Sequence, residues 1–198
     1  EINAQYAANF RIASGGGRMR ITMDRYEADW EMVRRGYHCH THGIGEHFES
    51  AAQAVESMYQ STGKDDQNLP AFVIQKDGEA VGRMNDGDAV ILFNFRGDRA
   101  IEISLAYERA DFAKFHRNEH RAHPKLYYAG MLQYDGDEMV PQQYLVNPPQ
   151  IDRTMSEFLC AEKVTSFAIS ETQKYGHVTF FWNGNRSGYI DKALETYI

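Results

Sequence analysis

The stretch at residues 89–100, AVILFNFRGDRA, limits the possible folds of this chain more than any other segment. Its first five residues, from Ala89 to Phe93, form the continuous apolar run that is typical of a buried strand. A glycine turn follows, and Asp98 stands where it can cap a helix over residues 98–109. A buried strand that leads directly into a helix is the unit from which α/β folds are built.

Further strands and helices alternate through most of the chain. The pattern predicts strands at residues 10–13, 89–95, 125–134 and 164–169, and a hairpin at residues 71–82 with a Lys-Asp-Gly turn. Helices are predicted after three capping-box patterns that begin at Asp24, Thr154 and Ser170, and also around residues 52–59. We therefore expect an α/β fold with a mainly parallel sheet flanked by helices and a small antiparallel hairpin.

Length and composition narrow the class of protein. With 198 residues and no visible linker, we expect one domain over residues 1–198. The net charge of −7 argues against nucleic-acid binding, and no apolar run approaches the roughly 20 residues of a membrane span. The two cysteines, Cys39 and Cys160, fit neither a metal-binding spacing nor a disulfide framework, which favours the cytoplasm. The chain begins at Glu1 and stops within apparent structure, so we expect a fragment of a longer protein, with a processed whole protein as the alternative.

Basic side chains recur where the predicted strands meet helices. Arg18 follows three glycines, Arg25 lies in the first predicted turn of a helix, and Arg96 and Arg99 close the strand at residues 89–95. Lys174 opens the helix after residues 164–169. Helix N-termini and arginine forks both suit phosphate or carboxylate oxygens, so these residues predict a site for a small polyanion. Solvent-exposed arginines are the alternative, and Arg20 is expected to be one.

A histidine-rich tract follows the first long helical pattern. His38, His40 and His42 alternate with other residues, and a zinc hydrolase could use such a tract. The tract lacks the aspartate of the metallo-β-lactamase pattern and follows a helix rather than a strand. A solvated, histidine-rich helix exit without bound metal is the favoured interpretation.

Four segments together resemble the cofactor-independent (2,3-bisphosphoglycerate-independent) phosphoglycerate mutases. They are GGRMRITMDRYEADW, DGDAVILFNFRGDRAIEIS, YAGMLQYDGD and FAISETQKYGHVTFFWNGNRSGY, which span nearly the whole chain from Phe10 onward. The triple glycine and FWNGNRSGY are similar to the plant and trypanosomatid members of this family.

The resemblance implies a fold, an activity and a role for each basic residue. Family members interconvert 3-phosphoglycerate and 2-phosphoglycerate through a phosphoserine, in glycolysis and gluconeogenesis. A phosphatase domain similar to alkaline phosphatase carries the serine and two metal ions, usually Mn²⁺, and a transferase domain inserted into it holds the substrate. This chain resembles the transferase domain alone, with Arg18, Arg25, Arg96 and Arg99 as substrate-binding residues and Lys174 as the catalytic lysine that reaches the transferring phosphoryl group.

The same resemblance places the serine and all metal ligands outside this chain. We therefore expect no metal bound by these residues and no turnover by the chain alone. Its expected partners are phosphoglycerate and the missing phosphatase domain, with no nucleic acid and no membrane. The alternatives are a non-catalytic module that binds an anionic phosphometabolite and, less favoured, a zinc hydrolase built on His38, His40 and His42.

Overall fold

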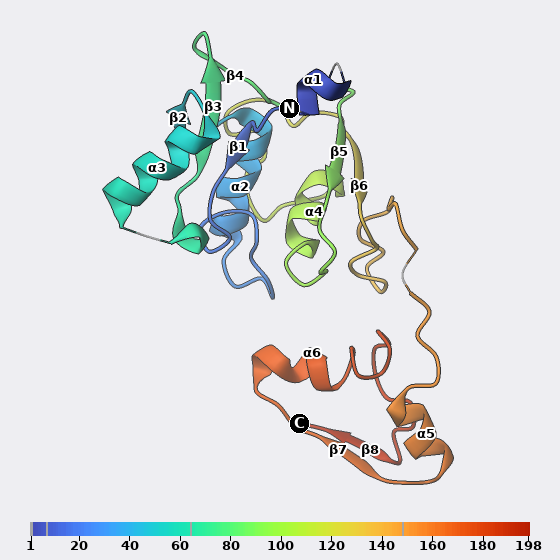
Figure 1. Ribbon diagram of the computed structural model, residues 1–198. Coiled ribbons are helices and arrows are strands. Elements are labelled where there is room, and N and C mark those ends of the chain that lie inside the picture. Colours follow the sequence, from blue (N-terminus) through green and yellow to red (C-terminus); the bar gives the residue numbers. More distant parts are fainter. Residues whose placement is uncertain (1, 7, 64, 148) are drawn as a thin grey trace. The chain divides into compact units, whose positions relative to one another are not determined.

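The computed structural model of the chain describes residues 2–6, 8–63, 65–147 and 149–198. It divides into two compact units, Glu1–Asn147 and Pro148–Ile198, which are described separately (Figure 1). The boundary falls in a proline-containing stretch, and the sequence carries no other signal for it.

The first sheet of the larger unit contains four short strands. The central strand β3 (Phe72–Lys76) lies between β1 (Ser14–Gly15), which is antiparallel to it, and β2 (Glu46–Phe48), which is parallel. The strand β4 (Glu79–Ala80) completes the expected hairpin with β3. Helix α3 (Ala51–Thr62) packs on β2, and its buried Ala54 and Met58 share a hydrophobic cluster with β3.

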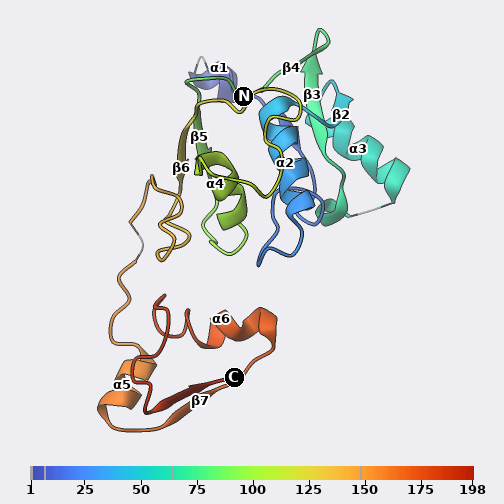
Figure 2. The same ribbon diagram turned by 180° about the vertical axis from the view of Figure 1, so that it is seen from behind.

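A second, parallel pair of strands lies on the other side of helix α2 (Trp30–His42). These strands are β5 (Ala89–Leu92) and β6 (Tyr127–Gly130). Helix α4 (Ile101–Glu108) packs between them and α2, so that α2 lies between α4 and the first sheet in both ribbon views (Figures 1 and 2). The core of this half contains Val33 and Tyr37 from α2, together with side chains of α4 and β6. The short elements α1 (Ile2–Tyr6) and η1 (Asp66–Asn68) lie outside this core.

The smaller unit is built around a third parallel pair, β7 (Ser166–Ala168) and β8 (Glu195–Tyr197). Helix α5 (Met155–Ala161) begins at the predicted capping box, in which Thr154 and Glu157 satisfy each other's backbone N–H groups. The unit also contains η2 (Thr172–Lys174) and α6 (Tyr175–Val178).

The expected α/β class is confirmed, and so are the hairpin and the Thr154 capping box. The strands form three small sheets among the described residues, where a single mainly parallel sheet was expected. The capping box predicted at Ser170 is wrong: its hydroxyl donates to the carbonyl of Glu171, and neither η2 nor α6 has a side-chain cap. Serine hydroxyls often bond locally in this way instead of capping a helix.

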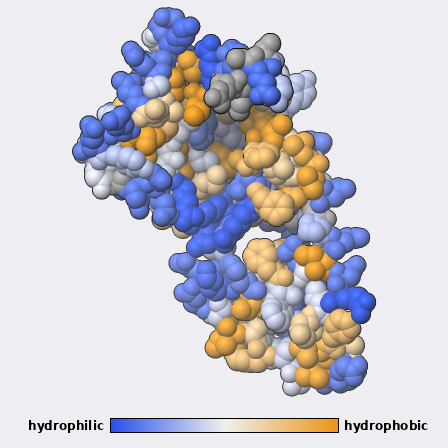
Figure 3. Space-filling view, viewed as in Figure 1, coloured by the Kyte–Doolittle hydropathy of each residue, from blue (hydrophilic) through white to orange (hydrophobic). Residues whose placement is uncertain are grey.

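Exposed hydrophobic side chains occur on both units (Figure 3). In the larger unit Phe93 and Phe95 are 85% and 75% exposed, and in the smaller unit Phe167 and Ile169 are 61% and 63% exposed. The helices of the described residues are all too short or too polar to cross a membrane. Cys39 and Cys160 lie in different units and are both free thiols.

Candidate functional site

The loop between β1 and α2 carries Arg18 and Arg25, and its end differs from the sequence expectation. Helix α2 begins at Trp30, and Asp29, not Asp24, caps it by accepting a hydrogen bond from the N–H of Met32. Tyr26 has a backbone φ of 63°, which no α-helix can contain. Asp24 instead accepts from the N–H of Asp29 at 2.7 Å, so the carboxylate closes the loop rather than starting the helix.

This loop rests directly on α2. The N–H of Thr22 donates to the carbonyl of Met32 at 2.9 Å. Gly36 permits the approach, because a Cβ atom at that position would lie 2.5 Å from the backbone nitrogen of Thr22. A glycine in the middle of a helix is unfavourable by itself, so its presence here reflects this contact.

Asp98 joins two of the predicted arginines. Its carboxylate accepts hydrogen bonds from Nε and Nη2 of Arg96 at 2.8 and 3.0 Å, and Nη1 of Arg25 lies 3.3 Å from its Oδ2. The expectation that Asp98 caps a helix is therefore wrong: α4 begins after Ala100 without a side-chain cap. The carboxylate is used across the tertiary contact instead, and its side chain is only 10% exposed.

Arg99 links the segment that carries Arg96 to the β1–α2 loop. It is partly buried, and its Nη1 donates to the carbonyl oxygen of Met23 in the β1–α2 loop. Burial, followed by the positive charges of Arg25 and Arg18, lowers the pKa of the Arg99 guanidinium. Nearby like charges repel one another, and Asp98 and Asp24 only partly offset that repulsion.

Arg18 and Arg20 make different contacts. Arg18 donates from Nε and Nη2 to Oε1 of Gln67, and its positive charge acts on Arg99. Arg20 is exposed and lines a hollow together with Arg35 and Pro70. The residues Arg18, Arg25, Arg96 and Arg99 are called the arginine cluster below.

Glu102, in the first turn of α4, contacts the loop that carries Arg25. It is 4% exposed, and its Oε1 accepts a hydrogen bond from the backbone N–H of Glu27 at 3.0 Å. Burial, supported by the neighbouring carboxyl of Asp24, raises the pKa of Glu102 to about 7. Through this hydrogen bond Glu102 helps to hold the loop that carries Arg25.

Glu102→Gln is expected to change how stability depends on pH. Since the folded pKa is raised from 4.5 to about 7, the wild-type chain loses stability as pH rises through that range, by up to about 3 kcal/mol at about 1.4 kcal/mol per unit. Glutamine imitates the protonated acid, so the variant should be more stable than the wild type at pH 8 and similar to it near pH 4.5.

Urea unfolding across this pH range measures the effect. Glu56→Gln, at an exposed position on α3, is the matched control and should follow the wild-type profile. A Glu102→Gln profile that runs parallel to the wild type would show that Glu102 is already ionised in the folded chain.

The arginine cluster has the chemistry of an anion site. Its guanidiniums carry four positive charges against the carboxylates of Asp98 and Asp24, while Glu102 is neutral below about pH 7. The side chain of Arg96 is 60% exposed, and its Nε and Nη2 donate to the carboxylate of Asp98. The same two donors could instead bind the carboxylate of a ligand. Asp98 thus brings the guanidiniums of Arg25 and Arg96 to one carboxylate.

The histidine tract does not form the trio that a zinc hydrolase would need. All three residues lie within α2, so the expected solvated helix exit is wrong. His38 and His42, one helical turn apart, are 2% and 3% exposed, with their Nδ1 atoms 3.1 Å apart. His40 lies on another face of the helix, between the hydroxyls of Ser14 and Thr22.

Comparison with known proteins identifies the family. The family model described as "BPG-independent PGAM N-terminus (iPGM_N)" matches residues 1–136. The chain belongs to the 2,3-bisphosphoglycerate-independent phosphoglycerate mutase family. It is 55% identical over 190 residues to a probable mutase of this kind from Leptospira interrogans, covering 96% of this chain and 34% of the relative.

Plant and trypanosomatid mutases are similarly close, as the sequence motifs predicted. The chain is 54% identical to Arabidopsis thaliana mutase 1 and 51% identical to the Trypanosoma brucei brucei mutase, covering 95% and 94% of this chain and 34% of each relative. A crystal structure of Leishmania mexicana phosphoglycerate mutase, at low cobalt concentration, matches with a TM-score of 0.83 and 48% identity. The match covers 98% of this chain and 35% of that one, so the chain spans about a third of the length of these mutases.

Side chains of the motif FWNGNRSGY hold parts of the smaller unit together. Asn183 is fully buried and donates to the hydroxyl of Tyr197 at 2.6 Å. Arg186 joins Glu157 of α5 to Asp152, with contacts of 2.7 and 2.9 Å. These polar residues therefore support the unit that carries Lys174.

Lys174, the lysine expected to be catalytic, ends η2 and directly precedes α6. Its side chain is exposed, and its backbone N–H donates to the carbonyl of Glu171 at 2.9 Å. It lies in the smaller unit, whereas the arginine cluster lies in the larger one.

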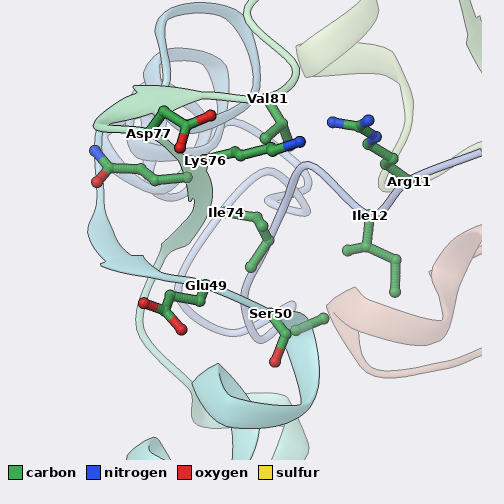
Figure 4. Close-up of a pocket in the computed structure, with 10 residues that line it drawn as sticks. Arg11, Ile12, Glu49, Ser50, Ile74, Lys76, Asp77 and Val81 are labelled. Atoms are coloured by element: carbon green, nitrogen blue, oxygen red, sulfur yellow. The ribbon is translucent and has the colours of Figure 1, made fainter.

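A hollow of about 540 Å³ in the larger unit is lined by residues outside the arginine cluster (Figure 4). Ile74 lies in its middle, with Glu49 on one side and Lys76, Asp77 and Arg11 on the others. Its charges are of mixed sign, so it does not favour an anion as the arginine cluster does.

Proposed function

We propose that this chain supplies the substrate-binding site of an enzyme that interconverts 3-phosphoglycerate and 2-phosphoglycerate. The arginine cluster binds the phosphoglycerate, with Asp98 positioning Arg25 and Arg96. Lys174 acts on the phosphoryl group during its transfer. The enzyme works in the cytoplasm, in glycolysis and gluconeogenesis, through a phosphoserine intermediate.

The observation that carries this proposal is the convergence of Arg25, Arg96 and Arg99. They come from two loops separated by about 70 residues and meet around Asp98 and Met23. Mutual repulsion makes such a group unfavourable without an anion. Phosphoglycerate carries about three negative charges near neutral pH, and arginine forks hold carboxylate and phosphate groups in fixed orientations.

The fork geometry also suits the particular problem of a mutase. The enzyme must keep hold of the glycerate while the phosphoryl group is away, and then present the other hydroxyl. Arginine side chains that bind the carboxylate can hold the glycerate without taking part in the transfer itself. In phosphoryl transfer the protein mainly positions the reactants and neutralises charge.

The manganese pair implied for this family does not fit the described residues. Within them, one group of three side chains, His38, Glu119 and His120, could hold a metal ion, and it offers too few ligands for two ions. The two Mn²⁺ ions and the serine are therefore assigned to the phosphatase domain of the whole enzyme. When bound there, the metals would supply Lewis-acid stabilisation of developing charge.

Calorimetric titration of 3-phosphoglycerate into the chain tests the binding proposal. Weak binding is expected, and it should be lost when glycerol 3-phosphate, which lacks the carboxylate, replaces the substrate. Arg99→Ala should weaken it, while Arg20→Ala should not. Equal binding of the two ligands, or loss with Arg20→Ala, would contradict a site built for phosphoglycerate.

A turnover assay separates the mutase from the alternative of a non-catalytic phosphometabolite-binding module. Full-length protein containing these residues should convert 3-phosphoglycerate to 2-phosphoglycerate with added Mn²⁺. Binding without turnover by that full-length protein would favour the module.

Lys174→Ala in the full-length enzyme should lower kcat about tenfold or more, with a smaller change in KM. The lysine is expected to interact most strongly as charge develops on the transferring phosphoryl group, and such interactions act on kcat. Steady-state kinetics measure the two constants, with Lys192→Ala, an exposed lysine of the same unit, as the control. An unchanged kcat with a raised KM would remove the catalytic role.

A further inference from the structure

The face of α2 opposite His40 contains a second group of polar side chains, which the proposed mutase reaction does not use. His38 and His42 project from this face, against the irregular segment at residues 109–126. The imidazole of His120 from that segment lies 4.8 Å from the ring of His38, centroid to centroid. Glu119 lies beside it, with Oε2 3.5 Å from Nε2 of His38 and Oε1 3.9 Å from Nε2 of His120.

The ligand atoms of His38, Glu119 and His120 all lie within 4.8 Å of one another. A tetrahedral zinc ion with bonds of about 2.0–2.2 Å needs its ligand atoms about 3.3–3.5 Å apart. Oε2 of Glu119 already meets this spacing to Nε2 of His38, and Oε1 of the same carboxylate lies a few tenths of an ångström beyond it from Nε2 of His120. His120 is partly exposed, so a small side-chain rotation can bring it into place.

An unsatisfied buried nitrogen points to a ligand here. His38 is 2% exposed, and its Nε2 is buried without a hydrogen-bond partner. Nε2 of His42, on the same face of α2, is in the same condition. A buried polar atom without a partner is unfavourable, and it calls for an unseen water or ion.

The surroundings resemble those of a metal centre. Arg34 donates to Oε2 of Glu119 at 2.7 Å, which holds the carboxylate beside His38. Glu119 and His120 lie at the surface, so an ion has a direct path in and a place for a water ligand. The positive charge of Arg34 opposes a cation, so moderate affinity is expected.

We propose that His38, Glu119 and His120 form a binding site for a first-row divalent metal ion with a preference for imidazole, most simply Zn²⁺. Two imidazoles and one carboxylate are a donor set that zinc favours. The ion would tie residues 109–126 to α2. The proposal departs from the expectation that this chain binds no metal, and it is independent of the mutase reaction.

Titration of Zn²⁺ into chelator-treated 198-residue chain tests the proposal by calorimetry. One ion should bind, and the imidazole ¹⁵N signals of His38 and His120 should shift on binding. Glu119→Gln, which keeps an acceptor for Arg34, and His120→Gln should each weaken binding about tenfold or more, in line with the loss of metal ligands. Both positions are at the surface, so neither variant should prevent folding.

His47→Gln is the matched control, because His47 is an exposed histidine of β2 outside the group. It should leave Zn²⁺ affinity within about twofold of the wild type. Absence of stoichiometric binding, or binding that Glu119→Gln and His120→Gln leave unchanged, would overturn the site. Neither result would affect the proposed phosphoglycerate site, whose residues are different.

Discussion

A polypeptide of these 198 residues is expected to form no measurable 2-phosphoglycerate from 3-phosphoglycerate, even with Mn²⁺ added. Uncatalysed phosphate-ester reactions are among the slowest known, so turnover needs an activated nucleophile and neutralisation of the developing charge. The arginine cluster can bind and orient the substrate. We assign the nucleophilic serine and both metal ions to the part of the enzyme outside these 198 residues, which span about a third of the related mutases.

An assay coupled through enolase measures this directly. The full-length enzyme containing the same 198 residues is the positive control, and it should be active under identical conditions. Turnover by the short chain that persists through purification would show that it assembles a complete site. The proposal that these residues bind substrate while other parts of the enzyme supply the serine and metals would then be wrong.

Arg99→Ala in the full-length enzyme is expected to lower kcat/KM by about 2–4 kcal/mol, or about 30- to 900-fold. Arg99 is partly buried and donates to the carbonyl of Met23. Its removal takes away a charged donor and also loosens the loop that carries Arg25. Arg96→Ala should cost a similar amount, because its guanidinium is exposed and can reach a ligand.

Two further variants identify the origin of the loss. Arg20→Ala removes an exposed arginine from the same loop and should change kcat/KM by less than about twofold. Arg99→Lys keeps the charge but not the fork, so it should recover only part of the activity. Equal losses from Arg20→Ala and Arg99→Ala would indicate a general charge effect rather than a binding site.

The sequence alone brought attention to the arginines that the structure places near Asp98 and Met23. Strand ends, glycine turns and the family resemblance singled out Arg18, Arg25, Arg96 and Arg99, and their role in binding substrate stays a prediction. The strand ends and glycine turns are local signals, whereas the family resemblance related residues that are distant in sequence. The family and the α/β class followed from the same segments.

Acidic residues were harder to interpret, because their roles depend on partners that are distant in sequence. Asp24 and Asp98 each looked like a helix cap, yet Asp24 closes a loop and Asp98 holds two arginines. Glu102 gave no signal at all, since its burial arises from the packing of α4 against the β1–α2 loop. The acid between the two arginines of RGDR is the signal that could have pointed to Asp98.

The histidine tract was misjudged for a related reason. Histidine is polar enough to suggest solvent, and the pattern did not show that α2 continues through His42 between two layers. The partners of His38, Glu119 and His120, lie more than 80 residues away in a segment without regular structure. Periodicity cannot indicate contacts made by such a segment.

A crystal structure of the full-length enzyme with 3-phosphoglycerate bound tests the central claim most directly. The account predicts carboxylate or phosphate oxygens about 2.7–2.9 Å from the guanidiniums of Arg25, Arg96 and Arg99, with Arg20 turned away. A substrate bound elsewhere, with Arg96 still on Asp98 and Arg99 still on Met23, would contradict it.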